Sequence, residues 1–286
     1  MLSKVKKYRL LFVMIPGILT WLGFRPGQPD TPSTNGRFCT GVHQSFLAGE
    51  VIVYKIFYNW NFVWIPAGEV MFKVSDQGEF FKLSATGRTY PSYEWFFKVR
   101  DYFEAVVDKN TLLPISSVRD IHEGKYTRYN KTEFDQSQPI IKYTWGKTKQ
   151  GLQKSGVYTP VDCTHDILSI IYALRNADFA TWKQQTNKSL GIFLDNDYWP
   201  VNITHMGKEV KRIHGLGKYP TIHLSPETIA GSVFKEGDRM HVWSSDDGNR
   251  IPLLIESPVS VGSVKIVIHK WSGLKHPFVL TKAATQ

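Results

Sequence analysis

Residues 48–74 read AGEVIVYKIFYNWNFVWIPAGEVMFKV and contain two alternating apolar runs. The first run covers residues 51–58 and the second ends at Val74, and each follows a small residue, a glycine and a glutamate. Alternation with a period of two directs every second side chain to the same face, as in a strand with one buried side. This stretch therefore predicts two strands that belong to one sheet.

The connection between these two strands is rich in aromatic residues. Turns mostly use Gly, Asn, Asp or Pro, whereas this connection also holds Trp60, Phe62 and Trp64. Such side chains either complete the core over the mouth of a barrel or remain available to a membrane surface, an acyl chain or a sugar ring. Tyr93 and Trp95, in a second aromatic segment, allow the same two interpretations.

Apolar alternation continues along most of the chain, and the breaks between the runs are short and contain turn residues. Successive strands with short connections are typical of an antiparallel meander, so the sequence predicts a mainly β fold built on a large curved sheet. The further predicted strands cover residues 79–87, 99–107, 113–121, 125–134, 140–145, 189–194, 199–205, 209–213, 219–224, 239–244, 251–256 and 260–268.

One segment breaks this pattern and predicts a single α-helix over about Asp162–Asn176. Its isoleucine and leucine residues fall at helical spacing, Asp162 or Thr164 is suited to cap its start, and Asn176 is suited to end it. The apolar stripe of this helix requires a partner surface, and a curved sheet provides one.

The two ends of the chain differ from its middle. Residues 1–24 combine a basic start with an apolar core, as in a signal peptide or an N-terminal anchor, although no Ala-x-Ala cleavage step follows. Residues 25–45 have the composition of a tether, residues 46–270 form one β domain, and residues 271–286 form a tail. We therefore expect export to the periplasm or to the periplasmic face of a membrane.

The two cysteines, Cys39 and Cys163, leave two possibilities open. In an oxidising compartment they can form a disulfide that closes a long loop, and otherwise they are buried free thiols. Cys39 lies well beyond the apolar core of the leader, so we do not expect a lipid anchor on it.

The net charge of the chain is +10, and four of the basic residues that produce it lie before Phe24 with no acid among them. The remaining charges are spread along the sequence, whereas a nucleic-acid partner favours a clustered basic face. The chain is 42% hydrophobic and 14% aromatic. This composition supplies enough apolar side chains for a sizeable core and excludes a disordered chain.

No known catalytic, metal-binding or cofactor-binding motif occurs in the sequence. Arg100-Asp101 and Arg119-Asp120 repeat one pairing on neighbouring predicted strands. They form either ion pairs across the strands or a polar anchor inside a cavity. If the protein were an enzyme that acts on a glycan, two carboxylates would have to face each other in one cleft, with Asp101, Glu104 and Asp120 as the candidates.

Several short motifs, in this order and spacing, resemble the exported-protein family of Gram-negative bacteria known as domain of unknown function 3108 (DUF3108), in its Bacteroidetes type. The resemblance covers about Phe46 to Ile268. It implies an antiparallel β fold, a curved sheet or half-open barrel, and a periplasmic or outer-envelope location, and it supplies no catalytic residues. The motifs are Ala48-Gly49-Glu50, Tyr58-Asn59-Trp60, Pro66-Ala67-Gly68-Glu69, Phe97-Lys98-Val99-Arg100-Asp101, Leu112-Leu113-Pro114, Arg119-Asp120 with Glu123-Gly124, Asp166-Ile167-Leu168-Ser169, and Val242-Trp243 through Asp247 to Arg250-Ile251-Pro252.

These observations favour a non-enzymatic envelope protein that binds or helps to assemble a lipid, a lipid-linked glycan or a polysaccharide. The candidate ligand-binding residues are Trp60, Phe62, Trp64, Tyr93, Trp95, Arg100, Asp101 and Arg119. An outer-envelope protein partner and peripheral contact with a membrane are compatible with this hypothesis. The alternatives are an enzyme that acts on envelope glycan and a purely structural scaffold.

Overall fold

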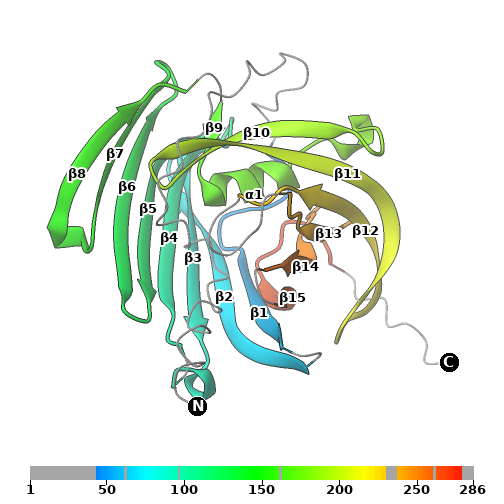
Figure 1. Ribbon diagram of the computed structural model, residues 1–286. Coiled ribbons are helices and arrows are strands. Elements are labelled where there is room, and N and C mark those ends of the chain that lie inside the picture. The colour runs from blue at the N-terminus through cyan, green and yellow to red at the C-terminus, as the bar shows by residue number, and fades with distance from the viewer. Residues whose placement is uncertain are drawn as a thin grey trace.

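The computed structural model describes residues 43–60, 63–95, 97–160, 163–229, 237–259 and 262–278. In this part of the chain, fifteen strands join in a single sheet around one α-helix (Figure 1). The first eight strands are β1 (Val51–Trp60), β2 (Val63–Gln77), β3 (Phe80–Thr89), β4 (Arg100–Asp108), β5 (Pro114–Glu123), β6 (Tyr126–Asp135), β7 (Ile140–Gly146) and β8 (Leu152–Tyr158). The others are β9 (Thr164–His165), β10 (Asn187–Leu194), β11 (Asp197–Ile213), β12 (Gly217–Pro226), β13 (His241–Ser245), β14 (Pro252–Pro258) and β15 (Ser263–Ser272).

The sheet consists of two meanders that meet at β1 and β15. Its order is β8-β7-β6-β5-β4-β3-β2-β1-β15-β14-β13-β12-β11-β10-β9, and all neighbouring strands are antiparallel except β9 and β10. The sheet curls strongly, and the long β10–β11 hairpin arches over α1 (Figure 1). The edge strands β8 and β9 do not pair with each other, so the sheet is a half-open barrel, as the sequence predicts.

The alternation of residues 51–58 places one face of β1 in the core. Ile52, Tyr54, Ile56 and Tyr58 are buried, whereas the residues between them are partly exposed. β1 continues to Trp60 and β2 begins at Val63, so the connection is shorter than the aromatic stretch suggests. Trp60 and Trp64 therefore belong to strands, because the backbone pairing of β1 with β2 extends to the end of the hairpin.

Two other segments differ from the sequence prediction. Residues 199–213 do not form two strands but part of one, β11, with a bulge between His205 and Gly207. Gly207 adopts a φ of 111°. This conformation is open to glycine, so the strand bends here without ending. The polar segment before Gly156 forms the edge strand β8, whose exposed side chains hide the strand pattern.

The helix α1 covers Ile167–Arg175, so it starts five residues later than the sequence prediction. The predicted caps Asp162 and Thr164 are wrong, because Thr164 and His165 are extended and pair with β10. Asp166 caps the helix instead, in a reciprocal arrangement with Ser169. The Asp166 carboxylate accepts a hydrogen bond from the backbone N–H of Leu168 at 2.8 Å, and the hydroxyl of Ser169 accepts one from the N–H of Asp166 at 3.0 Å. Asp162 itself lies outside the described residues.

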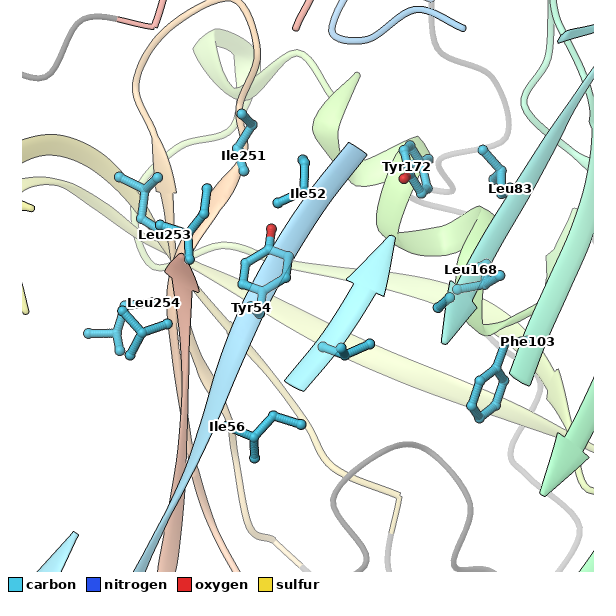
Figure 2. Packing of buried hydrophobic residues seen from close by; sticks show 14 of the residues in the cluster. Ile52, Tyr54, Ile56, Leu83, Phe103, Leu168, Tyr172, Ile251, Leu253 and Leu254 are labelled. Carbon is cyan, nitrogen blue, oxygen red and sulfur yellow. The ribbon is translucent and has the colours of Figure 1, made fainter. Parts of the chain in front are cut away.

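The core is divided into two main parts. The larger gathers side chains from β1, β2, β3, β4, one face of α1 with Leu168 and Tyr172, and the C-terminal strands (Figure 2). The second lies between another face of α1, which carries Ile170, and strands β10, β11 and β12. A small third cluster, made of Phe134, Ile141 and Phe193, joins β10 to the inner face of β6 and β7. The helix therefore fills the inside of the curled sheet rather than lying on its outside.

The ends of the predicted domain are tied to this core. The side chain of Asn176 accepts hydrogen bonds from the backbone N–H groups of Gln44 and Ser45, at 2.7 and 3.0 Å. At the other end, β15 continues to Ser272. The predicted leader, residues 1–24, and most of the tether lie outside the described residues. Among the helices that the structure describes, none has the length and apolarity needed to span a membrane.

Candidate functional site

A large cavity with an apolar lining lies inside the curled sheet, against α1. Its volume is about 330 Å³, which is within the range of about 300–1,000 Å³ that is typical of small-molecule pockets. Strands β1, β2 and β10–β15 supply the rest of its wall. Aliphatic side chains dominate the lining, among them Ile56 of β1, Ile170, Ile171 and Leu174 of α1, and Ile203 and Leu224 of β11 and β12.

Four charged side chains line this cavity, and three of them are neutralised by a partner. Arg175 forms a buried pair with Glu50, with two N–O distances of 2.6 and 2.8 Å. The other two neutralised groups are carboxylates. Asp195 lies 2.7 Å from Arg119, and Glu227 lies 2.7 Å from Arg239.

The fourth charged group, Arg250, has different surroundings. Its guanidinium donates a hydrogen bond to the carbonyl oxygen of Ala177 and lies 5.7 Å from the centre of the Phe179 ring, which also lines the cavity. Among the described residues, no carboxylate forms an ion pair with it. The apolar cavity therefore carries one positive charge without a counter-charge from the described part of the chain.

A second cluster of charged groups lies on the inner face of β4 and β5. Asp101 and Glu123 are almost completely buried, and their carboxyl groups are close enough to influence each other's protonation. Burial raises the pKa of both carboxyl groups, and the nearby Asp101 carboxylate raises the pKa of Glu123 further. Arg119, on the same face, opposes both shifts and binds Asp195 at the tip of the β10–β11 hairpin. This cluster joins the two halves of the sheet.

The described aromatic candidates lie away from the apolar cavity. Trp64 is 36% exposed on β2, with Nζ of Lys265 4.3 Å from its ring centre, and Trp95 is 84% exposed. Tyr93 packs against the main core cluster. Phe62 and the side chain of Trp60 lie outside the described part of the structure, so their predicted role stays a prediction.

The charged candidates separate onto the two faces of the sheet. Asp101 and Arg119 point inward, whereas Arg100 pairs with Glu94 at the surface. Of the other two acids considered for catalysis, Glu104 pairs with Lys82, at 2.7 Å, and Asp120 contacts His122, at 2.8 Å; both acids are on the outer face. The three acids therefore do not meet in one cleft. Within the described residues, no group of three or more His, Cys, Asp or Glu side chains is arranged to hold a metal ion.

Cys163 is disulfide-bonded. Cys39 lies outside the described residues, so the pairing of the two cysteines stays a prediction.

The sequence motifs include Glu123 and Arg250 only as parts of a family resemblance, with no role in a site, and they do not locate the cavity. The apolar stripe of the predicted helix was the one available sign of the cavity, because Ile167, Ile170, Ile171 and Leu174 all line it. No sequence feature marked the gap between this stripe and the sheet, since that gap depends on how far the sheet curls.

Comparison with known proteins supports the fold and gives no activity. A β-barrel-like protein of domain of unknown function DUF1849 from Brucella abortus is similar, with a TM-score of 0.54 and 8% identity over 83% of this chain and 98% of that chain. A protein from Bacteroides fragilis, described as exported and with a YmcC-like fold, is 8% identical over 81% of this chain and all of that chain. Its TM-score of 0.28 supports no conclusion about this fold. No curated protein matches the sequence. A family model with the description "Protein of unknown function (DUF3108)" matches residues 53–269.

Proposed function

Because the chain belongs to the DUF3108 family, a family of unknown function, we propose a role for it from its own cavity. The protein is a non-enzymatic binding protein of the cell envelope, and it holds the apolar chain of an amphipathic ligand between α1 and the sheet. The single observation that carries this proposal is the cavity of about 330 Å³ with its aliphatic lining.

The character of the lining favours some ligands over others. Each methylene group that moves from water into such surroundings contributes about 0.8 kcal/mol, so about ten of them contribute about 8 kcal/mol before the costs of binding. A free polysaccharide would leave most of its hydroxyl groups without hydrogen-bond partners in this cavity, at a large cost. A lipid or a lipid-linked glycan therefore suits the cavity better.

The envelope location rests on residues 1–24, which have the composition of an export signal. The Bacteroidetes type of the family, an outer-envelope protein partner and contact with a membrane surface remain predictions. Fractionation of cells that produce the full chain would test the location, and recovery in the cytoplasm would contradict it.

Binding of a fluorescent fatty acid, cis-parinaric acid, to the purified full chain tests the proposal. Val242 lines the cavity, so V242F narrows it and is expected to weaken binding at least tenfold. Val210 is 65% exposed, and V210F is the matched control that should bind as the wild type does. Thermal unfolding of both variants shows whether they are folded. The proposal fails if the wild type does not bind the probe, or if folded V242F binds it equally well.

A further inference from the structure

We propose that the ligand of the cavity is an anionic amphiphile and that the guanidinium of Arg250 binds its carboxylate or phosphate group. This inference rests on the proposed function and specifies the chemistry of the ligand. It follows from the charges of the lining: Arg175, Asp195 and Glu227 each have a partner of opposite sign, and Arg250 has none among the described residues.

The cost of an uncompensated charge supports this assignment. A charged group beside an apolar cavity loses part of its hydration, and proteins normally pair such groups. The cation–ring contact with Phe179 and the hydrogen bond to Ala177 offset only part of this loss, because both partners are uncharged. A ligand anion would supply the missing charge.

The backbone at Arg250 is held in an uncommon conformation. Its φ is 48°, in the left-handed region that non-glycine residues rarely adopt. The carboxylate of Asp247 accepts hydrogen bonds from the N–H groups of Asn249 and Arg250, at 2.9 and 3.0 Å, and the hydroxyl of Ser245 accepts one from Ile251 at 2.9 Å. Strained residues that the surroundings hold in place are frequent at binding sites. The turn between β13 and β14 thus fixes the position from which the Arg250 side chain reaches the cavity.

The chemistry of the guanidinium suits both carboxylates and phosphates. It carries five N–H donors in a plane, so it binds either group through two parallel hydrogen bonds. The acyl chain would lie between α1 and the sheet. The anionic group would lie at the end of the cavity where Phe179 and the β13–β14 turn meet.

Three probes with the same chain length distinguish the contribution of the anionic group to binding from that of the alkyl chain. They are palmitate, hexadecyl phosphate and hexadecanol. Hydrogen bonds to a charged group contribute about 1.5–3 kcal/mol, so R250Q is expected to bind at least one anionic probe about 10- to 100-fold more weakly. Hexadecanol should bind equally well to the wild type and to R250Q, which also shows that the variant is folded. R250K should recover part of the loss. R212Q, which changes an exposed arginine outside the cavity, is the matched control.

The outcomes separate the two proposals. If no probe binds to the wild type, the proposed function fails. If the probes bind but R250Q weakens the anions no more than hexadecanol, the inference about Arg250 is overturned and the apolar binding site remains. A selective loss for palmitate or for hexadecyl phosphate supports the inference and shows which anionic group the site accepts.

Discussion

The guanidinium of Arg175 contacts both carboxylate oxygens of Glu50, at 2.6 and 2.8 Å, and both side chains are buried. The same guanidinium donates hydrogen bonds to the carbonyl oxygens of Ser45 and Asn249, each at 3.1 Å. One side chain at the end of α1 therefore connects the helix to the segment before β1 and to the β13–β14 turn. It also borders the cavity, so it fixes the distance between helix and sheet there.

The Glu50–Arg175 pair gives the first prediction. In Glu50→Gln, the charge of Arg175 stays buried without its partner, which costs about 3–5 kcal/mol in comparable cases. We expect urea-induced unfolding to show a loss of that size in the free energy of unfolding. The double variant with Arg175→Met should lose less than Glu50→Gln alone, because no charge remains buried. A loss below about 1 kcal/mol in the single variant would contradict a structural role of the pair.

The Asp101–Glu123 pair predicts a pH dependence of stability. The pKa of Glu123 lies above its ordinary value of 4.5 in the folded chain, so the folded state retains a proton that the unfolded state releases. Its contribution to stability is fully present below about pH 4.5 and decreases as the pH rises towards the folded-state pKa. In Glu123→Gln this titration is removed. Between pH 5 and pH 8, the free energy of unfolding should then fall less in Glu123→Gln than in the wild type. The difference between the two decreases should be on the order of 2–4 kcal/mol.

Exposed Glu79 provides the control for this pH experiment, because Glu79→Gln should keep the pH dependence of the wild type. Equal slopes for the wild type and Glu123→Gln would show that the buried carboxyl pair does not control the pH dependence.

The Arg119–Asp195 pair predicts a local effect on the β10–β11 hairpin. Its side chains are 9% and 8% exposed, whereas those of the Lys131–Glu133 pair are 48% and 56% exposed. We expect Arg119→Met to cost about 3–5 kcal/mol and Lys131→Met less than about 1 kcal/mol. Hydrogen exchange should become faster at the hairpin tip in Arg119→Met only. Similar losses in both variants would mean that burial does not distinguish the two pairs.

Gly68 predicts a steric effect at the β2–β3 pairing. A Cβ atom at this position would overlap the carbonyl oxygen of Arg88, which belongs to the neighbouring backbone and cannot move aside easily. Gly68→Ala should therefore lower the free energy of unfolding by about 1–3 kcal/mol. In Gly151→Ala the nearest atom is the side-chain hydroxyl oxygen of Thr148, which can rotate, so thermal unfolding should change less. The reverse order would contradict the predicted strand contact.

The sequence predicts most strands because their alternation follows directly from burial on one face. It does not predict that residues 199–213 belong to one strand. A glycine between two alternating runs, here Gly207, looks the same in the sequence whether the strand bends at a bulge or ends in a loop. It also misplaces the start of α1. Asp162, Thr164 and Asp166 are all suitable caps, and only the pairing of Thr164 with β10 selects Asp166.

Part of the charged site could have been found from spacing alone. Asp101 and Glu104 are three residues apart in one strand, so they must point to opposite faces. Arg119 and Glu123 are four residues apart and share the inner face. The apolar cavity could not be found in this way, because α1 meets residues from both halves of the chain and their separation depends on the curvature of the whole sheet.

The pairing of β1 with β15 has a mechanical consequence. Val51, at the start of the first strand, lies opposite Ser272, at the end of the last. A force applied to these two ends would load the hydrogen bonds between β1 and β15 one after another, in an unzipping geometry. It would not load all of them at once in shear. A short linker could also join the two ends and allow new termini to be cut in another loop, with every strand pairing kept.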